Sequence, residues 1–160
     1  MPAFEIRPAL PHEASFLTML ALRSKAYWGY SAEFMAACRE ELTYSAADFQ
    51  HIDFFVADRA GALLGFYALA RHSPTQVELE ALFVEPDHIG QGIGRALIEH
   101  AKTTAGAKGA KTMIIQGDPH AKRFYLAAGG ELTGETESGS IPGRYLPTFS
   151  IRLAAKNSGQ

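Results

Sequence analysis

Three glycines alternate between Glu85 and Arg95, at Gly90, Gly92 and Gly94. The segment follows an apolar run and precedes apolar residues at helical spacing, so it is predicted to join a strand to a helix. Glycines leave backbone N–H groups unshielded at the helix N-terminus, where an anion such as phosphate is stabilised. The turn therefore favours phosphate binding, and the alternative is a purely structural glycine turn.

Two well-known phosphate motifs do not fit this turn. A dinucleotide fingerprint needs glycine or alanine where Arg95 or Leu97 stands. A Walker-type loop that begins at Gly90 needs glycine at the Arg95 position and lysine where Ala96 stands. The sequence thus excludes both of these nucleotide-binding motifs.

The stretch ELEALFVEPDHIGQGIGRALIEHA resembles the acetyl-CoA-binding core of the GNAT superfamily of N-acetyltransferases. In that family an apolar strand feeds the loop R/Q-x-x-G-x-G/A, which here begins at Ile89 and fits Gly92 and Gly94. The later stretch DPHAKRFYLAAG resembles the family signature N-x-x-A-x-x-F-Y-x-x-x-G. Ile89 replaces Arg or Gln, and Asp118 replaces Asn.

The resemblance implies that acetyl-CoA is the acetyl donor. Backbone groups at Leu82 and Val84 resemble the family's ladder for the pantetheine arm, and a backbone N–H near Val84 would face the thioester carbonyl. The residues that the resemblance places around the donor are Leu82, Phe83, Val84, Ile89, Gly90, Gln91, Gly92, Ile93, Gly94, Arg95, Asp118, Ala121 and Phe124.

Acetyl transfer to an amine requires proton removal, because an amine of pKa near 10 is mostly ammonium at pH 7, a deficit of about 4 kcal/mol. The strand before the turn carries Glu78 and Glu80, and Glu80 is the preferred base, acting directly or through water. Alternatively, both glutamates are solvated residues of a strand's outer face. Tyr125 matches the family tyrosine that can protonate the leaving thiolate, and its alternative is a role as an aromatic core residue.

The acceptor is expected to be a small-molecule or peptide amine, in a pocket between the first two helices and a late loop. The candidate pocket residues are Tyr27, Trp28, Tyr30, Phe34 and Arg144, each of which could instead be a core or surface residue. Arg144 could meet a substrate carboxylate. A different class of function stays open, namely a catalytically silent acetyl-CoA sensor or interaction module.

The surrounding elements are predicted from periodicity. A short strand at 4–7 precedes helices at 11–29 and 31–42, a hairpin at 52–71 and a third strand at 76–84. Strict alternation along that third strand places Val77, Leu79, Ala81 and Phe83 on one face and Glu78, Glu80, Leu82 and Val84 on the other.

A helix at 91–105, ended by Gly106, follows the glycine turn. A buried strand at 111–116, a short helix at 121–128 and two late strands complete the order. This order predicts a mixed α/β (α+β) sheet of six or seven strands flanked by about four helices, in one domain over residues 1–154, with a frayed tail at 155–160. The last strand, YLPTFSIRL, is expected at a sheet edge, where pairing would produce a homodimer.

Composition limits the remaining possibilities. The 160 residues include 47% hydrophobic and 20% charged residues, which excludes a disordered chain. Fifteen basic and 17 acidic residues give a net charge of −2, so neither nucleic acid nor an anionic membrane is an expected partner. The single cysteine, Cys38, excludes an intramolecular disulfide, and six scattered histidines indicate no metal site. No apolar run reaches the length of a membrane span, and the residues SKAYWGY and SIPGRYLP resemble bacterial GNAT proteins, so a bacterial cytoplasmic protein is expected.

Overall fold

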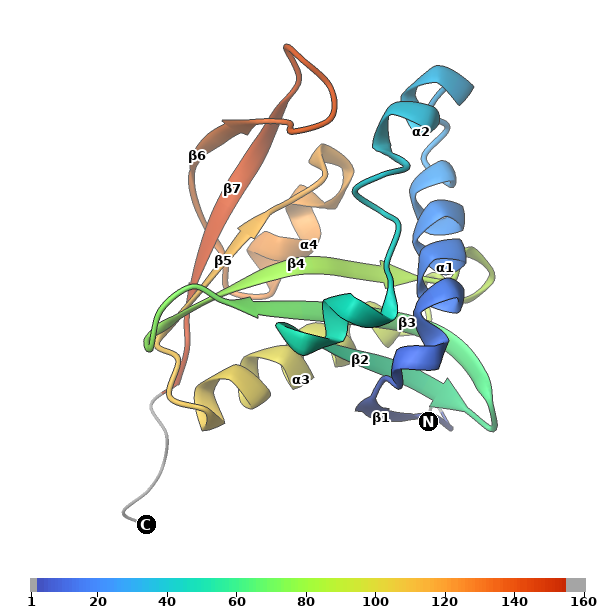
Figure 1. Ribbon diagram of the computed structural model, residues 1–160. Coiled ribbons are helices and arrows are strands. Elements are labelled where there is room, and N and C mark those ends of the chain that lie inside the picture. Colours follow the sequence, from blue (N-terminus) through green and yellow to red (C-terminus); the bar gives the residue numbers. More distant parts are fainter. Residues whose placement is uncertain (1–2, 155–160) are drawn as a thin grey trace.

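A seven-stranded sheet with helices on both faces makes up the computed structural model, which describes residues 3–154 (Figure 1). The predicted mixed sheet of six or seven strands with about four helices is therefore confirmed. The predicted frayed tail at 155–160 lies outside the described residues. The strands are β1 (Glu5–Pro8), β2 (Ile52–Arg59), β3 (Ala62–Arg71), β4 (Gln76–Val84), β5 (Thr112–Gln116), β6 (Glu131–Glu137) and β7 (Tyr145–Arg152). The helices are α1 (Ala14–Ala26), α2 (Ala32–Cys38), α3 (Ile93–Ala107) and α4 (Lys122–Ala127), with short 3-10 turns between some elements.

The strand order is β1-β2-β3-β4-β5-β7-β6, and β4 and β5 are the one parallel pair among the described strands. These two strands pair only from Gln76 to Leu79, opposite Thr112 to Ile115. Beyond Leu79 the β4 backbone has no strand on its β5 side. The sheet is thus split in its middle, and backbone groups of β4 are left available there.

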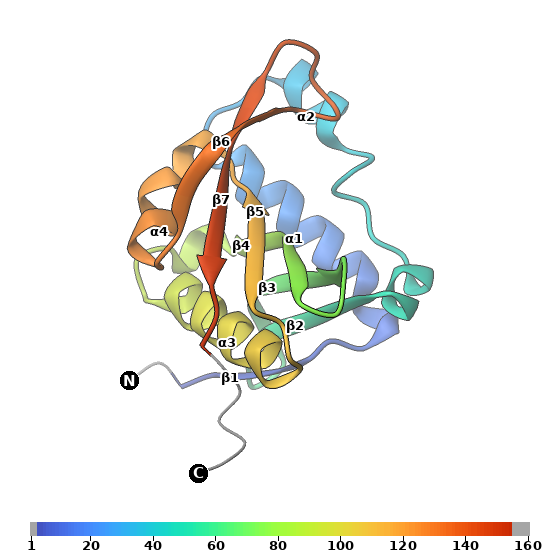
Figure 2. The same cartoon turned by 90° about the vertical axis from the view of Figure 1, so that its left-hand side faces the viewer.

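The two faces of the sheet are covered by different helices (Figures 1 and 2). Leu17, Leu20 and Ala21 of α1 are buried against Phe54, Val56 and Phe66. On the opposite face α3 packs Ile93, Leu97, Ile98 and Ala101 into a second core, which also includes Tyr125 of α4. Gly65 of β3 permits the close approach of α3, because a Cβ there would lie 2.8 Å from the Phe83 carbonyl oxygen and 3.1 Å from Leu97 Cδ1.

A β-bulge interrupts the side-chain alternation along β4, so the strict alternation predicted for this strand is wrong. Ala68 pairs with Ala81 but Leu69 pairs with Leu79, so Glu80 is the extra residue. The bulge shifts the phase of the strand by one residue. Val77 and Leu79 therefore lie in the core beneath α3, whereas Ala81 and Phe83 belong to the core beneath α1.

Other predicted boundaries also change. The second helix begins as predicted, where the Ser31 hydroxyl accepts from the Phe34 N–H at 3.1 Å, but it ends at Cys38 rather than near Leu42. The chain turns there instead, with the Leu42 N–H bonded to the Cys38 and Arg39 carbonyls. Helix α3 continues through Gly106, and Gly109, with φ of 94°, makes the turn after it.

Strand β7 was predicted at a sheet edge, and this prediction is wrong. β7 lies between β5 and β6, so its backbone pairs on both sides. The edge strands are β1 and β6, and every residue of β6 is exposed. Within residues 3–154, none of the helices combines the length and apolar character needed to cross a membrane.

Candidate active site at the split of the sheet

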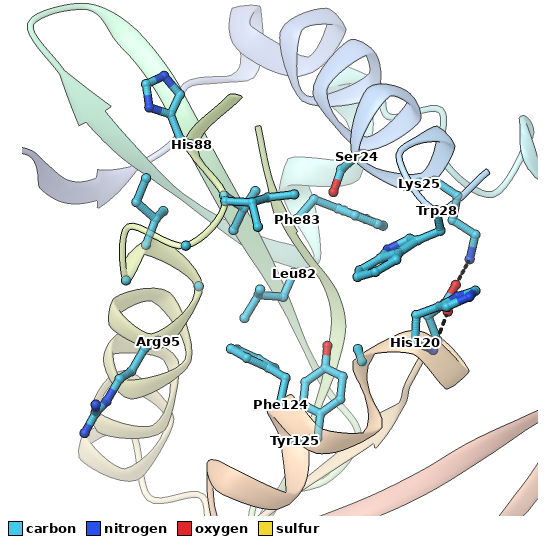
Figure 3. Close-up of a pocket in the computed structure, with 18 residues that line it drawn as sticks. Ser24, Lys25, Trp28, Leu82, Phe83, His88, Arg95, His120, Phe124 and Tyr125 are labelled. Atoms are coloured by element: carbon cyan, nitrogen blue, oxygen red, sulfur yellow. Dashed lines mark hydrogen bonds and ion pairs between the residues drawn. The ribbon is translucent and has the colours of Figure 1, made fainter. Parts of the chain in front are cut away.

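A cavity of about 410 Å³ opens between the end of β4, the start of α3, the start of α4 and the end of α1 (Figure 3). We call it the donor-side cavity. Every residue predicted to surround acetyl-CoA lines it except Gln91, whose Oε1 lies 3.2 Å from Nδ1 of His88. In Figure 3 the Arg95 side chain runs along α3, away from Tyr125 and Trp28. Arg95 therefore contributes its backbone to this cavity more than its guanidinium.

The glycine turn presents free N–H groups to the donor-side cavity. Gly90 and Gly92 have φ of 86° and 82°, a left-handed conformation that favours glycine. The first helical hydrogen bond of α3 runs from the Ala96 N–H to the Gly92 carbonyl at 3.0 Å, so Ile93 and Gly94 hold N–H groups without an intrahelical acceptor. A Cβ at Gly92 would meet nothing within 4 Å, which shows that the space above the turn is open.

Tyr125 lies where the cavity meets the split in the sheet. Its side chain is only 6% exposed, and burial raises its pKa above the ordinary value of a tyrosine. No hydrogen bond joins its hydroxyl to any other residue in the described part of the chain. Figure 3 shows this hydroxyl directed into the cavity, beside Leu82. The hydroxyl is accessible from the cavity, and a protonated hydroxyl without a protein partner is available to a bound molecule.

A second cavity, of about 280 Å³, adjoins the first at the split in the sheet, and its wall includes residues of β4, β5 and β7. We call it the acidic cavity, because its wall includes Glu41, Glu78 and Glu80. Tyr44 and Gln116 add further polar groups. Burial raises the pKa of Tyr44, and the negative charges of Glu80 and Glu41 raise it further.

The two cavities share five residues: Lys25, Leu82, Phe83, Asp118 and Tyr125. They therefore meet at the unpaired part of β4, directly at the Tyr125 side chain. A molecule in one cavity can contact a molecule in the other at this junction.

The two candidate bases have different surroundings. Glu78 accepts from Nε2 of His72 at 2.9 Å, whereas Glu80 forms no hydrogen bond or ion pair with another described residue. Glu80 is exposed at this cavity, and partial desolvation there raises its pKa, which the negative charge of Glu78 raises further. Glu80 is therefore free to accept a proton from a bound molecule, whereas Glu78 is already bonded to His72.

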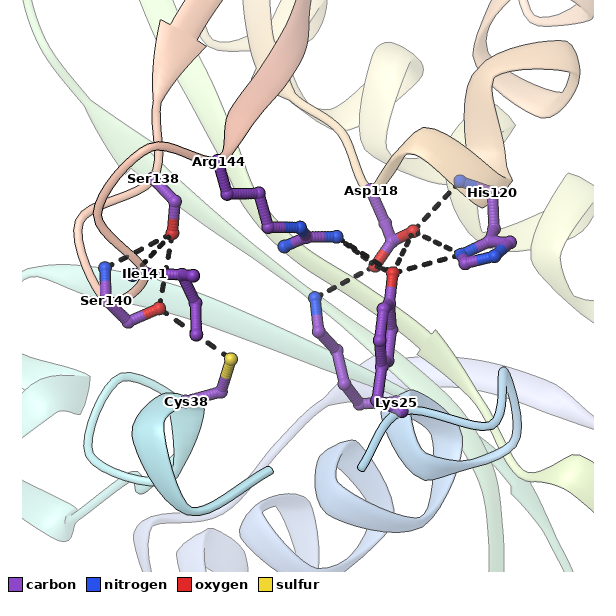
Figure 4. A network of polar contacts seen from close by, with 9 residues as sticks. Lys25, Cys38, Asp118, His120, Ser138, Ser140, Ile141 and Arg144 are labelled. Carbon is purple, nitrogen blue, oxygen red and sulfur yellow. Dashed lines mark hydrogen bonds and ion pairs between the residues drawn. The ribbon is translucent and has the colours of Figure 1, made fainter. Parts of the chain in front are cut away.

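Asp118 joins four segments of the chain beside the junction (Figure 4). Its carboxylate accepts from Lys25 Nζ of α1 at 2.9 Å, from the Tyr30 hydroxyl at 2.9 Å and from the His120 N–H at 2.9 Å, and Arg144 Nη2 lies 3.5 Å away. Burial alone would raise the pKa of Asp118, but the His120 N–H and the Lys25 ammonium hold it well below its ordinary value. Asp118 is therefore ionised and holds these segments together.

Most of the aromatic residues predicted for the acceptor pocket lie elsewhere. Tyr27, Tyr30, Phe34 and Arg144 line neither cavity. The chain turns at Gly29 and carries Tyr30 to Asp118, where its ring stacks on Phe34 with centroids 4.0 Å apart. Arg144 donates to the Tyr30 hydroxyl at 2.8 Å, so its guanidinium already has a protein partner rather than being free for a substrate carboxylate. Trp28 lines the donor-side cavity instead, stacked on the His120 ring at 4.9 Å.

The sequence did not predict several residues in or beside the two cavities. Lys25, Glu41 and Tyr44 line the acidic cavity, and His72 and His120 contact Glu78 and Asp118. No local motif marks them, since they lie on segments far apart in the sequence. Within the described residues no group of three or more His, Cys, Asp or Glu side chains is placed to hold a metal ion.

Comparisons with known proteins agree on one family. Residues 50–129 match the acetyltransferase (GNAT) domain family. The peptidyl-lysine N-acetyltransferase YjaB of Salmonella typhimurium is 41% identical over 77 residues, which are 48% of this chain and 51% of that protein. The matched stretch thus spans about half the length of this curated relative.

Two solved structures share the fold over nearly the whole chain. A GCN5-related N-acetyltransferase from Rhodopseudomonas palustris superposes with a TM-score of 0.79 and 24% identity, covering 96% of this chain and 98% of that one. The PaiA N-acetyltransferase of Thermoplasma acidophilum, solved with coenzyme A, superposes with a TM-score of 0.76 and 21% identity, covering 94% and 99%. At these identities the likeness concerns the fold.

Proposed function

Because the chain belongs to the GNAT acetyltransferase superfamily, we propose that it transfers the acetyl group of acetyl-CoA to a primary amine. Donor and acceptor would be held at the same time, one in each cavity. The observation that carries this proposal is the junction of the donor-side and acidic cavities at Tyr125 and the unpaired backbone of β4. Direct attack of the amine on the acetyl thioester needs such an opening between the two binding cavities.

The residues present fit acetyl-CoA. The free N–H groups at the start of α3 suit its pyrophosphate, and the unpaired β4 backbone near Leu82 and Val84 suits the amide groups of its pantetheine arm. The largely apolar wall formed by Ile89, Val84 and Phe124 suits the remaining length of that arm. When bound, acetyl-CoA supplies an activated acetyl thioester.

Glu80 is proposed as the general base. It accepts the proton of the amine nitrogen, directly or through water, as that nitrogen bonds to the acetyl carbon. Its raised pKa brings it nearer to the operating pH, where a base is most effective. Glu78 remains the alternative base, and proton loss to solvent is a third route.

Tyr125 is proposed as the acid. As the carbon–sulfur bond breaks, its hydroxyl donates a proton to the leaving sulfur and recovers one from solvent. Burial keeps this hydroxyl protonated at neutral pH. Because a thiolate with pKa near 8.5 leaves readily, the contribution of Tyr125 to the rate is modest. A backbone N–H near Val84 would stabilise the charge that develops on the carbonyl oxygen.

The relative YjaB is named a peptidyl-lysine N-acetyltransferase, which supports a primary amine as acceptor. The second candidate function is a catalytically silent acetyl-CoA sensor, and the donor-side cavity alone would suffice for it. The unpartnered Tyr125 at the junction and the unpartnered Glu80 on the acidic cavity favour an enzyme.

The two functions are separated by one experiment. Calorimetry should show that CoA binds, and a thiol reagent should show free CoA released from acetyl-CoA with at least one member of an amine panel. Mass spectrometry should then find the acetylated amine. Binding of CoA without any amine-dependent thiol release would support the sensor and contradict the enzyme.

A further inference from the structure

The acidic cavity has a marked excess of negative charge on its wall. Glu41 from the segment after α2 and Glu78 and Glu80 from β4 contribute three carboxylates, and Asp118 contributes a fourth at the junction. Among residues 3–154, Lys25 is the one lysine or arginine on this wall, and its ammonium is bound to Asp118 at 2.9 Å. Glu78 accepts from His72 Nε2 at 2.9 Å, so Glu41 and Glu80 are the two carboxylates of this wall left without a basic partner among the described residues.

A second observation shows that this space is built for a bound molecule. The Tyr125 side chain is only 6% exposed, and its hydroxyl lacks a protein partner among the described residues and is accessible at the junction of the cavities. A purely structural acidic surface would not open onto an unpaired proton donor held by a nearly buried side chain. The carboxylates therefore line the approach to a reacting centre.

The carboxylates of the acidic cavity come from two separate segments of the chain, which suits them to different roles. Glu80 is the bulge residue of β4 and Glu78 lies two residues earlier on the same strand, whereas Glu41 belongs to a different segment of the chain. One cation could thus lie at the β4 glutamates while another part of the same molecule lies near Glu41. In a partly enclosed cavity, an oppositely charged group is attracted more strongly than in bulk water.

We propose that the acceptor is an aliphatic amine that carries a second positive charge, and that Glu41 selects for this second charge. This inference rests on the proposed acetyltransferase function and specifies its substrate class. The chemistry is that of a small diamine or polyamine, or of a lysine side chain beside another basic residue in a peptide. Glu41 binds the distal cation, and amines with a neutral or carboxylate tail are disfavoured.

The test compares three five-carbon amines that differ only at the far end. Cadaverine ends in a second ammonium, pentylamine in a methyl group and 5-aminovalerate in a carboxylate. We expect kcat/KM to be about 10-fold higher for cadaverine than for pentylamine, and lowest for 5-aminovalerate, the scale of a favourable ion pair in a partly exposed site. Calorimetry in the absence of acetyl-CoA should rank their affinities in the same order, and added salt should reduce the difference.

A matched pair of variants assigns the effect to Glu41. Glu41→Gln should reduce the ratio of cadaverine to pentylamine kcat/KM about 3- to 10-fold, mainly through KM for cadaverine. Glu40→Gln removes the same charge from the exposed neighbouring residue, which lines neither cavity, and should leave that ratio unchanged. Two peptides, one with Lys-Lys and one with Lys-Glu, distinguish a basic peptide from a free diamine as the source of this chemistry.

These experiments separate failure of the substrate inference from failure of the proposed acetyltransferase function. If pentylamine is acetylated as well as cadaverine, or if Glu41→Gln leaves their ratio intact, the inference is overturned while the acetyltransferase function stands. If no amine releases CoA from acetyl-CoA, the proposed function itself fails. Should calorimetry nevertheless rank cadaverine first and Glu41→Gln abolish that ranking, the cavity selects dications without acetylating them.

Discussion

At the scale of single residues, Glu80 has the environment of a base that titrates above the ordinary glutamate range. Its position in the β4 bulge places it on the acidic cavity without a protein partner. Although the residue is exposed, partial desolvation at the cavity and the charge of Glu78 both disfavour its ionised form. The acid limb of the pH–rate profile should therefore lie above the ordinary glutamate pKa, with activity falling as the pH is lowered through it.

Glu80→Gln keeps the size of the side chain and removes its basicity. We expect turnover to fall about 10²-fold while CoA affinity stays nearly unchanged, and higher pH should partly restore activity because more of the amine is then neutral. Steady-state kinetics from pH 6 to 9 with calorimetry of CoA would measure this. Tyr125→Phe should lower turnover less.

Glu78→Gln is the informative comparison for Glu80→Gln. If the Glu78 variant loses turnover and the Glu80 variant does not, Glu78 is the base. If neither variant loses turnover, the proton leaves to solvent and the enzyme acts by bringing the two reactants together.

For Asp118 the prediction concerns the stability of the fold rather than catalysis. Its pKa is depressed in the folded protein, so its contribution to stability is complete above the ordinary aspartate pKa and is lost as the pH falls through the folded value. Asp118→Asn should lower the free energy of unfolding by about 2 kcal/mol at pH 7, and the difference should shrink toward pH 3. Denaturant unfolding at several pH values measures it.

Asp53→Asn is the control for Asp118→Asn. Asp53 also pairs with a lysine, Lys108 at 3.3 Å, but both side chains are about half exposed. Such a surface pair contributes little, so this variant should change stability by less than about 1 kcal/mol. Equal effects of the two variants would contradict the linking role of Asp118.

At the scale of elements, α3 offers a direct test of anion binding. Gly92→Val forces a branched side chain into a left-handed conformation at the N-terminus of the helix and covers its N–H groups. We expect CoA affinity to fall at least 10-fold, because the pyrophosphate would lose those donors. The single tryptophan, Trp28, lies on the same cavity, so its fluorescence can report binding beside calorimetry.

The other end of the same helix supplies the control. Gly109 has φ of 94° and open space around its Cβ position, as Gly92 has, but it follows the C-terminus of α3. Gly109→Val should cost a similar 1–2 kcal/mol of stability through backbone strain and leave CoA affinity intact. Loss of affinity in both variants would mean that strain, rather than the anion site, explains the Gly92 result.

At the scale of the whole molecule, the closeness of the sheet to α3 depends on Gly65. Gly65→Ala would place a methyl group 2.8 Å from the Phe83 carbonyl oxygen, so β3, β4 and α3 must move apart. We expect a loss of about 1–3 kcal/mol in the free energy of unfolding by denaturant. Gly139→Ala, which meets nothing within 4 Å, should be nearly neutral, and an equal loss there would contradict this account.

The homodimer expected from the sequence stays a prediction, but its original argument no longer holds. β7 is paired on both sides, so the strand exposed for edge pairing at this end of the sheet is β6. Its residues Glu131, Glu135 and Glu137 place carboxylates along that edge, a feature that discourages pairing between copies.

The sequence by itself determined the order of elements, the glycine turn before α3 and the family resemblance. These follow from local signals: periodicity of two or 3.6 residues, glycines that permit positive φ, and two motifs of a dozen residues or fewer. Twelve of the residues expected around the donor are on the wall of the donor-side cavity, and they come from two short motifs that are each contiguous in the chain.

Only the tertiary structure decided the bulge at Glu80, the interior place of β7 and the composition of the acidic cavity. A bulge depends on how β3 and β4 pair, and the place of β7 depends on pairing with β5 about 35 residues earlier in the chain. Likewise, Lys25, Glu41 and Asp118 meet because packing of α1 and the loops around the split sheet brings distant segments together. Such contacts join residues that share no local pattern, so no periodicity or motif could have predicted them.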